Sequence, residues 1–157
     1  MKKLPLSRIK TRYDEARYWA EQALAYYESS MILASSESEF KSMPIITLQA
    51  FSAECSLKSL ILLSTSIVKV RGHELKELFE ALSSDLQTNL SQSFFDEFDR
   101  DLIDALQEVS TDFIDSRYYH EELKRKLFGR SFAVGYLEAI SKFLLDFIEV
   151  NGDSLKN

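Results

Sequence analysis

The residues best suited to chemistry lie in the second half of the chain, in the stretch Arg117-Tyr118-Tyr119-His120-Glu121. A guanidinium can hold a phosphate through two hydrogen bonds, and an imidazole can move protons near neutral pH. If this stretch is helical, Arg117 and His120 occupy neighbouring positions on one face, where they could cleave RNA without a metal. The alternative interpretation is structural: Arg117 pairs with a nearby acid, while Tyr118 and Tyr119 pack on the helices.

Three further polar residues are candidate ligand-binding groups. Glu54 and Lys58 stand four residues apart in an apolar segment, a spacing that predicts an ion pair on one helix face. A structural role for this pair is favoured over a catalytic one. His73 follows Gly72 at a predicted helix start, where a histidine more often caps or packs than binds a ligand.

Most catalytic and metal-binding motifs are missing from the sequence. It has no glycine-rich phosphate loop, no Cys/His spacing for zinc and no Gly-x-Ser-x-Gly motif. A di-iron bundle would need glutamate three residues before histidine, but Val70 and Arg117 stand at those positions. No metal and no cofactor are therefore expected.

Length and composition predict one globular domain. The chain has 157 residues, of which 45% are apolar and 28% charged, values typical of a folded protein. We expect a basic tail over residues 1–12, a single domain over 13–152 and a short tail over 153–157. The net charge of -6 argues against sequence-blind binding of nucleic acid, although it allows a local site.

Targeting and redox features predict a cytoplasmic protein. The single cysteine, Cys55, rules out an intramolecular disulfide, and its apolar surroundings predict a buried, inert thiol. No apolar run follows the basic start, so we expect no signal peptide. Glu138, Lys142 and Asp146 interrupt the longest apolar helix, near residues 132–150, so we expect no membrane span.

Helices should dominate the fold, because the chain has only four glycines and two prolines. Apolar periodicity predicts helices over 13–35, 44–68, 74–82, 94–109 and 131–150. Residues 113–122 look irregular. The fold class that follows is all-α, an antiparallel bundle of four to five helices. The residues expected to face inward include Leu24, Met31, Leu60, Phe94, Phe95, Phe98, Val109 and Phe143. The last helix is apolar over a wide arc, which predicts a central position or a dimer interface.

Three segments in this order resemble the HEPN family. They are Ala50-Phe-Ser-Ala-Glu-Cys-Ser-Leu-Lys58, then Gly72-His-Glu-Leu-Lys-Glu-Leu-Phe79, then Arg117-Tyr118, and the likeness spans roughly residues 15 to 150. The resemblance implies a bundle of four or five helices, frequently a homodimer, with polar residues lining a cleft. Active members are metal-independent ribonucleases of toxin-antitoxin, phage-defence and CRISPR systems.

This sequence departs from the ribonuclease motif, in which histidine follows arginine after four to six residues. Before His120 the matching positions hold Phe113, Ile114 and Asp115, and no arginine precedes His73 at that spacing either. The leading hypothesis is thus a non-catalytic HEPN-like module that binds a nucleotide, RNA or a partner protein, in a bacterial defence or toxin-antitoxin system. One alternative is a ribonuclease with an Arg117/His120 site composed across a homodimer, and another is a purely structural helical module.

Overall fold

The fold consists of six helices over the part of the chain that the structure describes. The computed structural model describes residues 9–39, 41–117 and 134–156, and the side chains of all but 111–117 and 134–135 within these ranges. The helices are α1 (Arg12–Ala34), α2 (Ser42–Ser64), α3 (Leu75–Glu80), α4 (Ser84–Phe98), α5 (Leu102–Arg117) and α7 (Val134–Asn151). No strand occurs within the described ranges, so the all-α prediction is confirmed.

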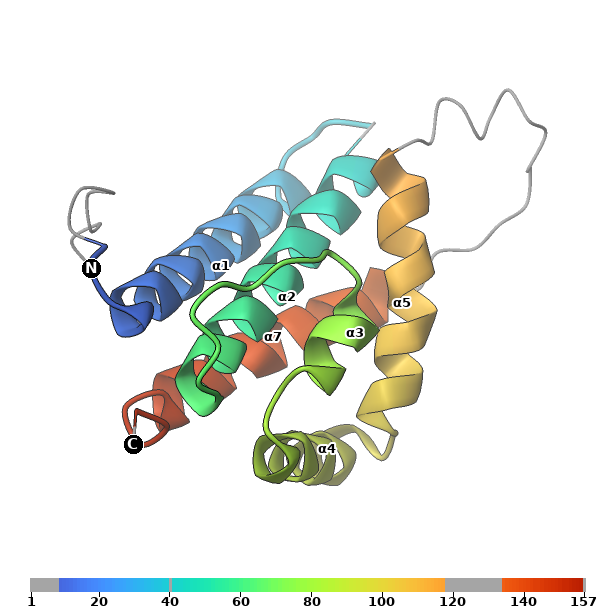
Figure 1. The fold of residues 1–157 in the computed structure, drawn as a ribbon. Coiled ribbons are helices and arrows are strands. Elements are labelled where there is room, and N and C mark those ends of the chain that lie inside the picture. The colour runs from blue at the N-terminus through green and yellow to red at the C-terminus, as the bar shows by residue number, and fades with distance from the viewer. Residues whose placement is uncertain (1–8, 40, 118–133, 157) are drawn as a thin grey trace.

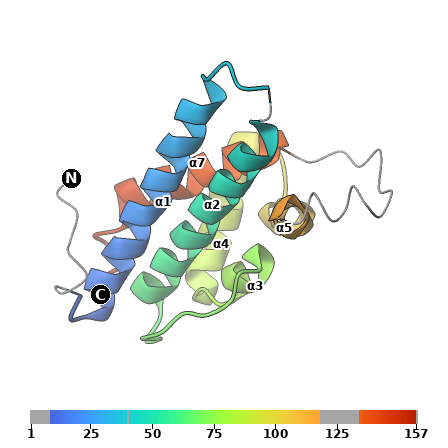
Figure 2. The same cartoon turned by 90° about the horizontal axis from the view of Figure 1, so that it is seen from above.

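Helix α2 occupies the centre of the molecule. It contacts α1, α3, α5 and α7, and Figures 1 and 2 show α1 on one side of it and α3 with α5 on the other. Every residue from Ser52 to Leu63 is buried, because this helix is apolar over more than one face. The prediction that this segment belongs in the middle of the bundle is confirmed.

Small residues let α2 approach its neighbours closely. The Ser59 hydroxyl donates to the Ala16 carbonyl oxygen of α1 at 2.8 Å. On α7, the Ser141 hydroxyl donates to the Gln49 carbonyl oxygen of α2 at 2.7 Å. Hydroxyls used in this way satisfy polar groups that burial would otherwise leave without partners.

Polar contacts stabilise the start of α1 and the end of α2, which lie next to each other. Thr11 and Asp14 form a capping box at the start of α1, and the hydrogen bond from the Thr11 hydroxyl is the main reason why the pKa of Asp14 is lowered. The Arg12 guanidinium donates to the carbonyl oxygen of Thr65, the residue that caps the C-terminal end of α2, at 2.6 Å. A basic group at the end of a helix satisfies a free carbonyl and the helix dipole together.

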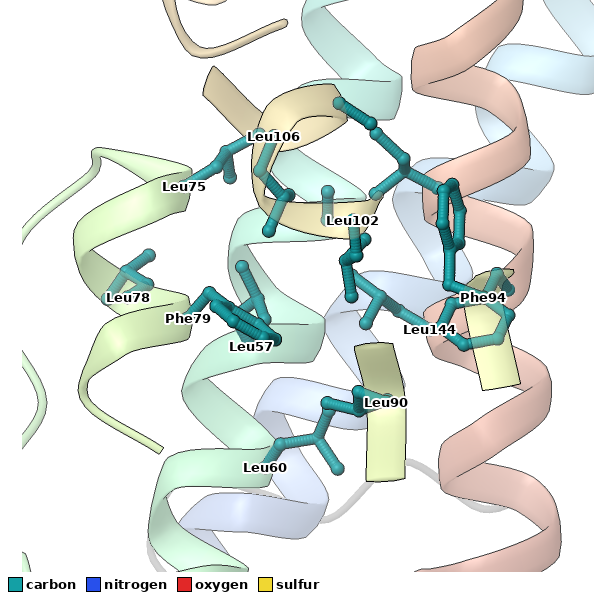
Figure 3. Packing of buried hydrophobic residues seen from close by; sticks show 14 of the residues in the cluster. Leu57, Leu60, Leu75, Leu78, Phe79, Leu90, Phe94, Leu102, Leu106 and Leu144 are labelled. Carbon is teal, nitrogen blue, oxygen red and sulfur yellow. The ribbon is translucent and has the colours of Figure 1, made fainter. Parts of the chain in front are cut away.

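One large apolar cluster joins the helices, with side chains from α2, α3, α4, α5 and α7 (Figure 3). Its largest fully buried members include Leu57, Leu60, Phe79, Phe94 and Leu106. The predicted core positions Leu60, Val109 and Phe143 are all buried. These predictions are confirmed, and they place the core around α2 as the periodicity indicated.

The helix predicted over 94–109 is wrong, because two helices share that range. Asp99 ends α4 in the left-handed conformation with a φ of 52°, and the Asp101 carboxylate accepts from the Asp104 backbone N–H at the start of α5. An aspartate tolerates left-handed backbone and caps helices well, so the chain turns here. The irregular structure predicted from residue 113 is also wrong as far as Arg117, which ends α5.

Several residues predicted to face inward are instead exposed. Phe95 and Phe98 are exposed on α4, and Leu24 and Met31 on α1. Three- and four-residue spacing identifies one face of a helix, but it does not say how far a neighbouring helix extends over that face. The predicted inward side of α1 is thus only partly covered.

Helix α2 is the one described helix that is long and apolar enough to cross a membrane, by length and composition alone. Most of its apolar window, 78%, is buried inside the protein. Burial of this extent is typical of the core helix of a soluble protein.

Candidate functional site

The centre of α2 carries a buried ion pair. The Lys58 ammonium lies 2.7 Å from Glu54 Oε1, and the two residues are 5% and 4% exposed. Their four-residue spacing puts them on one face of the helix, as the sequence predicted. Each charge compensates the hydration that the other loses on burial, since an isolated buried charge is strongly destabilising.

Trp19 of α1 covers the Lys58 ammonium. The Nζ atom lies 4.9 Å from the centroid of the indole ring, a distance at which the ring quadrupole attracts a cation. The second carboxylate oxygen of Glu54 and the Trp19 Nε1 atom are buried and make no hydrogen bond to the described residues. The pair therefore sits in a mostly apolar setting between α1 and α2.

His73 connects this buried pair to the surface. Its Nδ1 atom lies 3.0 Å from Glu54 Oε1, although its side chain is 67% exposed. In the tautomer with the proton on Nδ1, the imidazole donates to Glu54 and keeps Nε2 as an acceptor. The α2–α3 loop, residues 65–74, is thereby attached to the middle of α2. The predicted ligand-binding residues Glu54, Lys58 and His73 lie together.

The Cys55 thiol, next to Glu54 in the sequence, has low reactivity. Cys55 is buried, and burial together with the adjacent Glu54 charge raises its pKa to about 12. A thiol with such a pKa is almost entirely protonated at neutral pH and therefore a poor nucleophile. This agrees with the inert role that its apolar surroundings predicted.

A groove of about 260 Å³ lies where the α2–α3 loop passes over the end of α2 and over α3. Its apolar lining consists of Ile61, Ile67, Val70, Leu78 and Ala81. Its charged lining consists of Lys69, Arg71, Glu74 and Glu77, with Gly72 between them. The volume is slightly below the range of about 300–1,000 Å³ that is usual for small-molecule sites.

The charged groups of this groove are available to a ligand. No hydrogen bond or ion pair joins the side chains of Lys69, Arg71, Glu74 or Glu77 to another described residue. Gly72 adopts a φ of +99°, a conformation that favours glycine, and open space surrounds its Cα. The backbone thus bends between Arg71, which lines the groove, and His73, which contacts Glu54.

The other predicted site residues are not brought to this region by any described contact. Arg117 is the last residue of α5, and its side chain lies outside the described part of the chain, as do Tyr118, His120 and Glu121. The sequence analysis did not select Lys69 and Arg71. The available signal was their position beside Gly72, in a short polar connection between two apolar helices.

The described residues offer no metal site, since no three His, Cys, Asp or Glu side chains among them are grouped to hold an ion. Comparisons of the chain with protein-family models, with curated proteins and with solved structures find no match. The geometry of the site is therefore the basis for the functional proposal.

Proposed function

We propose that this chain is a non-catalytic, HEPN-like helical module that binds a nucleotide in the groove under the α2–α3 loop. The observation that carries the proposal is an apolar groove with two cations at its edge, Lys69 and Arg71, that make no ion pair with any described residue. A nucleotide presents the matching chemistry, a flat and largely apolar base next to an anionic phosphate.

The groove offers a partner for each part of such a ligand. Ile67, Val70 and Ala81 provide an apolar surface for one face of a base, and the buried side chains of Ile61 and Leu78 lie beneath it. Arg71 can hold phosphate oxygens through two charge-assisted hydrogen bonds, and Lys69 adds a second positive charge. The carboxylates of Glu74 and Glu77 can accept hydrogen bonds from ribose hydroxyls or from an exocyclic amino group.

Size favours a mononucleotide over a longer RNA or a protein. A groove of about 260 Å³ holds about one base with its sugar, and the net charge of -6 opposes the binding of a long polyanion. The groove also lies within one chain, so this binding does not depend on the homodimer that the family resemblance implies.

The His73–Glu54 contact gives the groove a fixed edge. Arg71 lies two residues before His73, whose imidazole is held 3.0 Å from the buried carboxylate. Because Glu54 is itself held by Lys58, the loop is anchored to the core next to its phosphate-binding residues. A rigid edge lowers the entropy that a ligand would lose in ordering the loop.

Isothermal titration calorimetry with ATP, GTP, CTP and UTP, and with adenosine as a ligand without phosphate, tests the proposal. We expect binding of at least one triphosphate and much weaker binding of adenosine. Arg71→Ala should weaken nucleotide binding roughly 10- to 100-fold, the effect of losing a hydrogen bond to a charged group worth about 1.5–3 kcal/mol. Lys142→Ala, which removes the same charge from the exposed face of α7, should leave the affinity unchanged.

Two results would contradict nucleotide binding at this groove. One is the absence of binding by any of the four triphosphates. The other is an equal loss of affinity in Arg71→Ala and Lys142→Ala, which would indicate a general effect of net charge.

Incubation with labelled RNA in the presence of EDTA tests whether the module is non-catalytic. We expect no cleavage by the wild type or by Arg117→Ala. Cleavage by the wild type that disappears in both Arg117→Ala and His120→Ala would instead establish a metal-independent ribonuclease.

A further inference from the structure

Exposed aromatic side chains on α4 and α7, none of which lines the groove, form the aromatic patch. Its members are Phe95, Phe98 and Tyr136, which are 50%, 37% and 42% exposed. Phe98 packs on Phe94 with a distance of 4.6 Å between ring centroids, and on Phe143 of α7 at 6.3 Å. Phe98 is therefore held against the core, although its outer surface meets water.

The grouping of exposed aromatic side chains points to a role in binding. Single exposed apolar residues are common on protein surfaces, but grouped aromatic rings more often mark interaction sites. Aromatic residues are also enriched among the residues that contribute most to binding energy at interfaces. The aromatic patch thus has the composition of a docking surface.

An acidic segment of the chain adjoins the aromatic side chains of α4. The segment from Asp96 to Asp104 holds five acids, all exposed, and a single base, Arg100. That base is already engaged: its guanidinium lies 3.9 Å from the centroid of the Tyr136 ring and pairs with the Glu108 carboxylate. Among the described residues of this segment, the free charge next to the aromatic side chains is therefore acidic.

We propose that the aromatic patch docks a cationic amphipathic segment of a partner protein. Bulky apolar side chains of that segment would cover Phe95, Phe98 and Tyr136, while its lysines or arginines would meet the surrounding carboxylates. This surface is separate from the nucleotide groove, so the inference does not rest on the proposed function.

The same charge pattern argues against other occupants. A symmetric contact between two copies of this chain would place the same surface on both sides and so oppose the acids of one copy to those of the other, which is unfavourable. Nucleic acid would be repelled for the same reason. A positively charged amphipathic partner can instead make apolar contacts with the aromatic rings and ion pairs with the carboxylates.

Fluorescence anisotropy tests this with a labelled helical peptide of leucine and lysine, and with a peptide in which glutamate replaces every lysine. The lysine peptide should bind the wild type, more tightly at low than at high salt, and the glutamate peptide should not. Phe95→Ser should weaken binding at least about 10-fold, as expected for an interface aromatic residue. Asp96→Lys should also weaken it, with a smaller effect at high salt.

Matched changes on α1 serve as controls. Ile32→Ser alters an apolar side chain that is 72% exposed, and Glu28→Lys reverses an exposed acid; both should leave peptide binding unchanged. Circular dichroism will verify that each variant is folded, and Asp96→Lys still tests the site if Phe95→Ser unfolds.

The proposal is overturned if the lysine peptide does not bind, or if the glutamate peptide binds equally well. Equal effects of the α4 variants and their α1 controls would also overturn it. Analytical ultracentrifugation covers the remaining possibility, since self-association of the wild type that Phe95→Ser abolishes would assign the surface to a second copy.

Discussion

Charged residues occur in two contrasting settings along the same helix and the loop that follows it. In the middle of α2, Glu54 and Lys58 are buried and joined at 2.7 Å. In the loop after α2, Lys69 and Arg71 line an open groove and make no ion pair within the described part of the chain. Charged side chains therefore stabilise the fold where they are buried and paired, and they can contact a ligand where they are exposed and have no partner among the described residues.

Removal of one charge from the buried pair should give the largest loss of stability. Lys58→Ala leaves the Glu54 carboxylate buried without its main partner, which should lower the free energy of unfolding by about 3–5 kcal/mol. Urea denaturation measures this. The double variant Glu54→Leu/Lys58→Met removes both charges and should recover most of the loss, and a double variant no more stable than Lys58→Ala would contradict this account.

Truncation of the apolar core around the pair should have a similar or slightly smaller effect. Leu60→Ala removes a fully buried side chain of α2 and should lower the free energy of unfolding by about 2–5 kcal/mol. Val150→Ala, at a site that is 80% exposed, should change it by less than about 0.5 kcal/mol. Thermal and urea melts of the two variants side by side provide the measurement.

Substitution of His73, which links the buried pair to the loop, should give an intermediate loss of stability. His73→Ala removes an exposed hydrogen-bond partner of Glu54 but leaves Lys58 in place, so the expected loss is about 0.5–1.5 kcal/mol. Hydrogen exchange should show faster opening of the loop amides while those of α2 stay protected. Equal deprotection of both segments would mean that His73 supports the core itself.

Arg71→Ala should have the smallest effect on stability. Its guanidinium makes no hydrogen bond to a described residue, so the free energy of unfolding should change by less than about 0.5 kcal/mol. A loss as large as that of Leu60→Ala would show that Arg71 is structural, and the nucleotide proposal would lose its main cation. The same melts that measure Leu60→Ala give this result.

The sequence predicted features that depend on contacts within one helix. The Glu54–Lys58 pair follows from a four-residue spacing, and the central position of α2 follows from apolar residues on more than one face. The burial of Cys55 follows from the same run. These predictions needed no knowledge of neighbouring helices.

Features that depend on distant parts of the chain could not be predicted in this way. The His73–Glu54 contact joins residues nineteen positions apart, and the groove exists because the loop crosses both α2 and α3. The exposure of Phe95 and Tyr136 likewise depends on how other helices pack against α4 and α7. The break at Asp99 depends on one residue in a left-handed conformation, which apolar periodicity does not report.

The pairing of α1 with α2 also has a consequence for how the chain folds. These two helices follow each other in sequence and share the most extensive contact among the described helices, so their hairpin can form before more distant segments arrive. Helix α7 joins α2 across a long separation, as the 92-residue span of the Ser141–Gln49 hydrogen bond shows. Since nearby contacts form at a lower entropic cost than distant ones, we expect changes within the α1–α2 hairpin to slow folding and changes on α7 chiefly to accelerate unfolding.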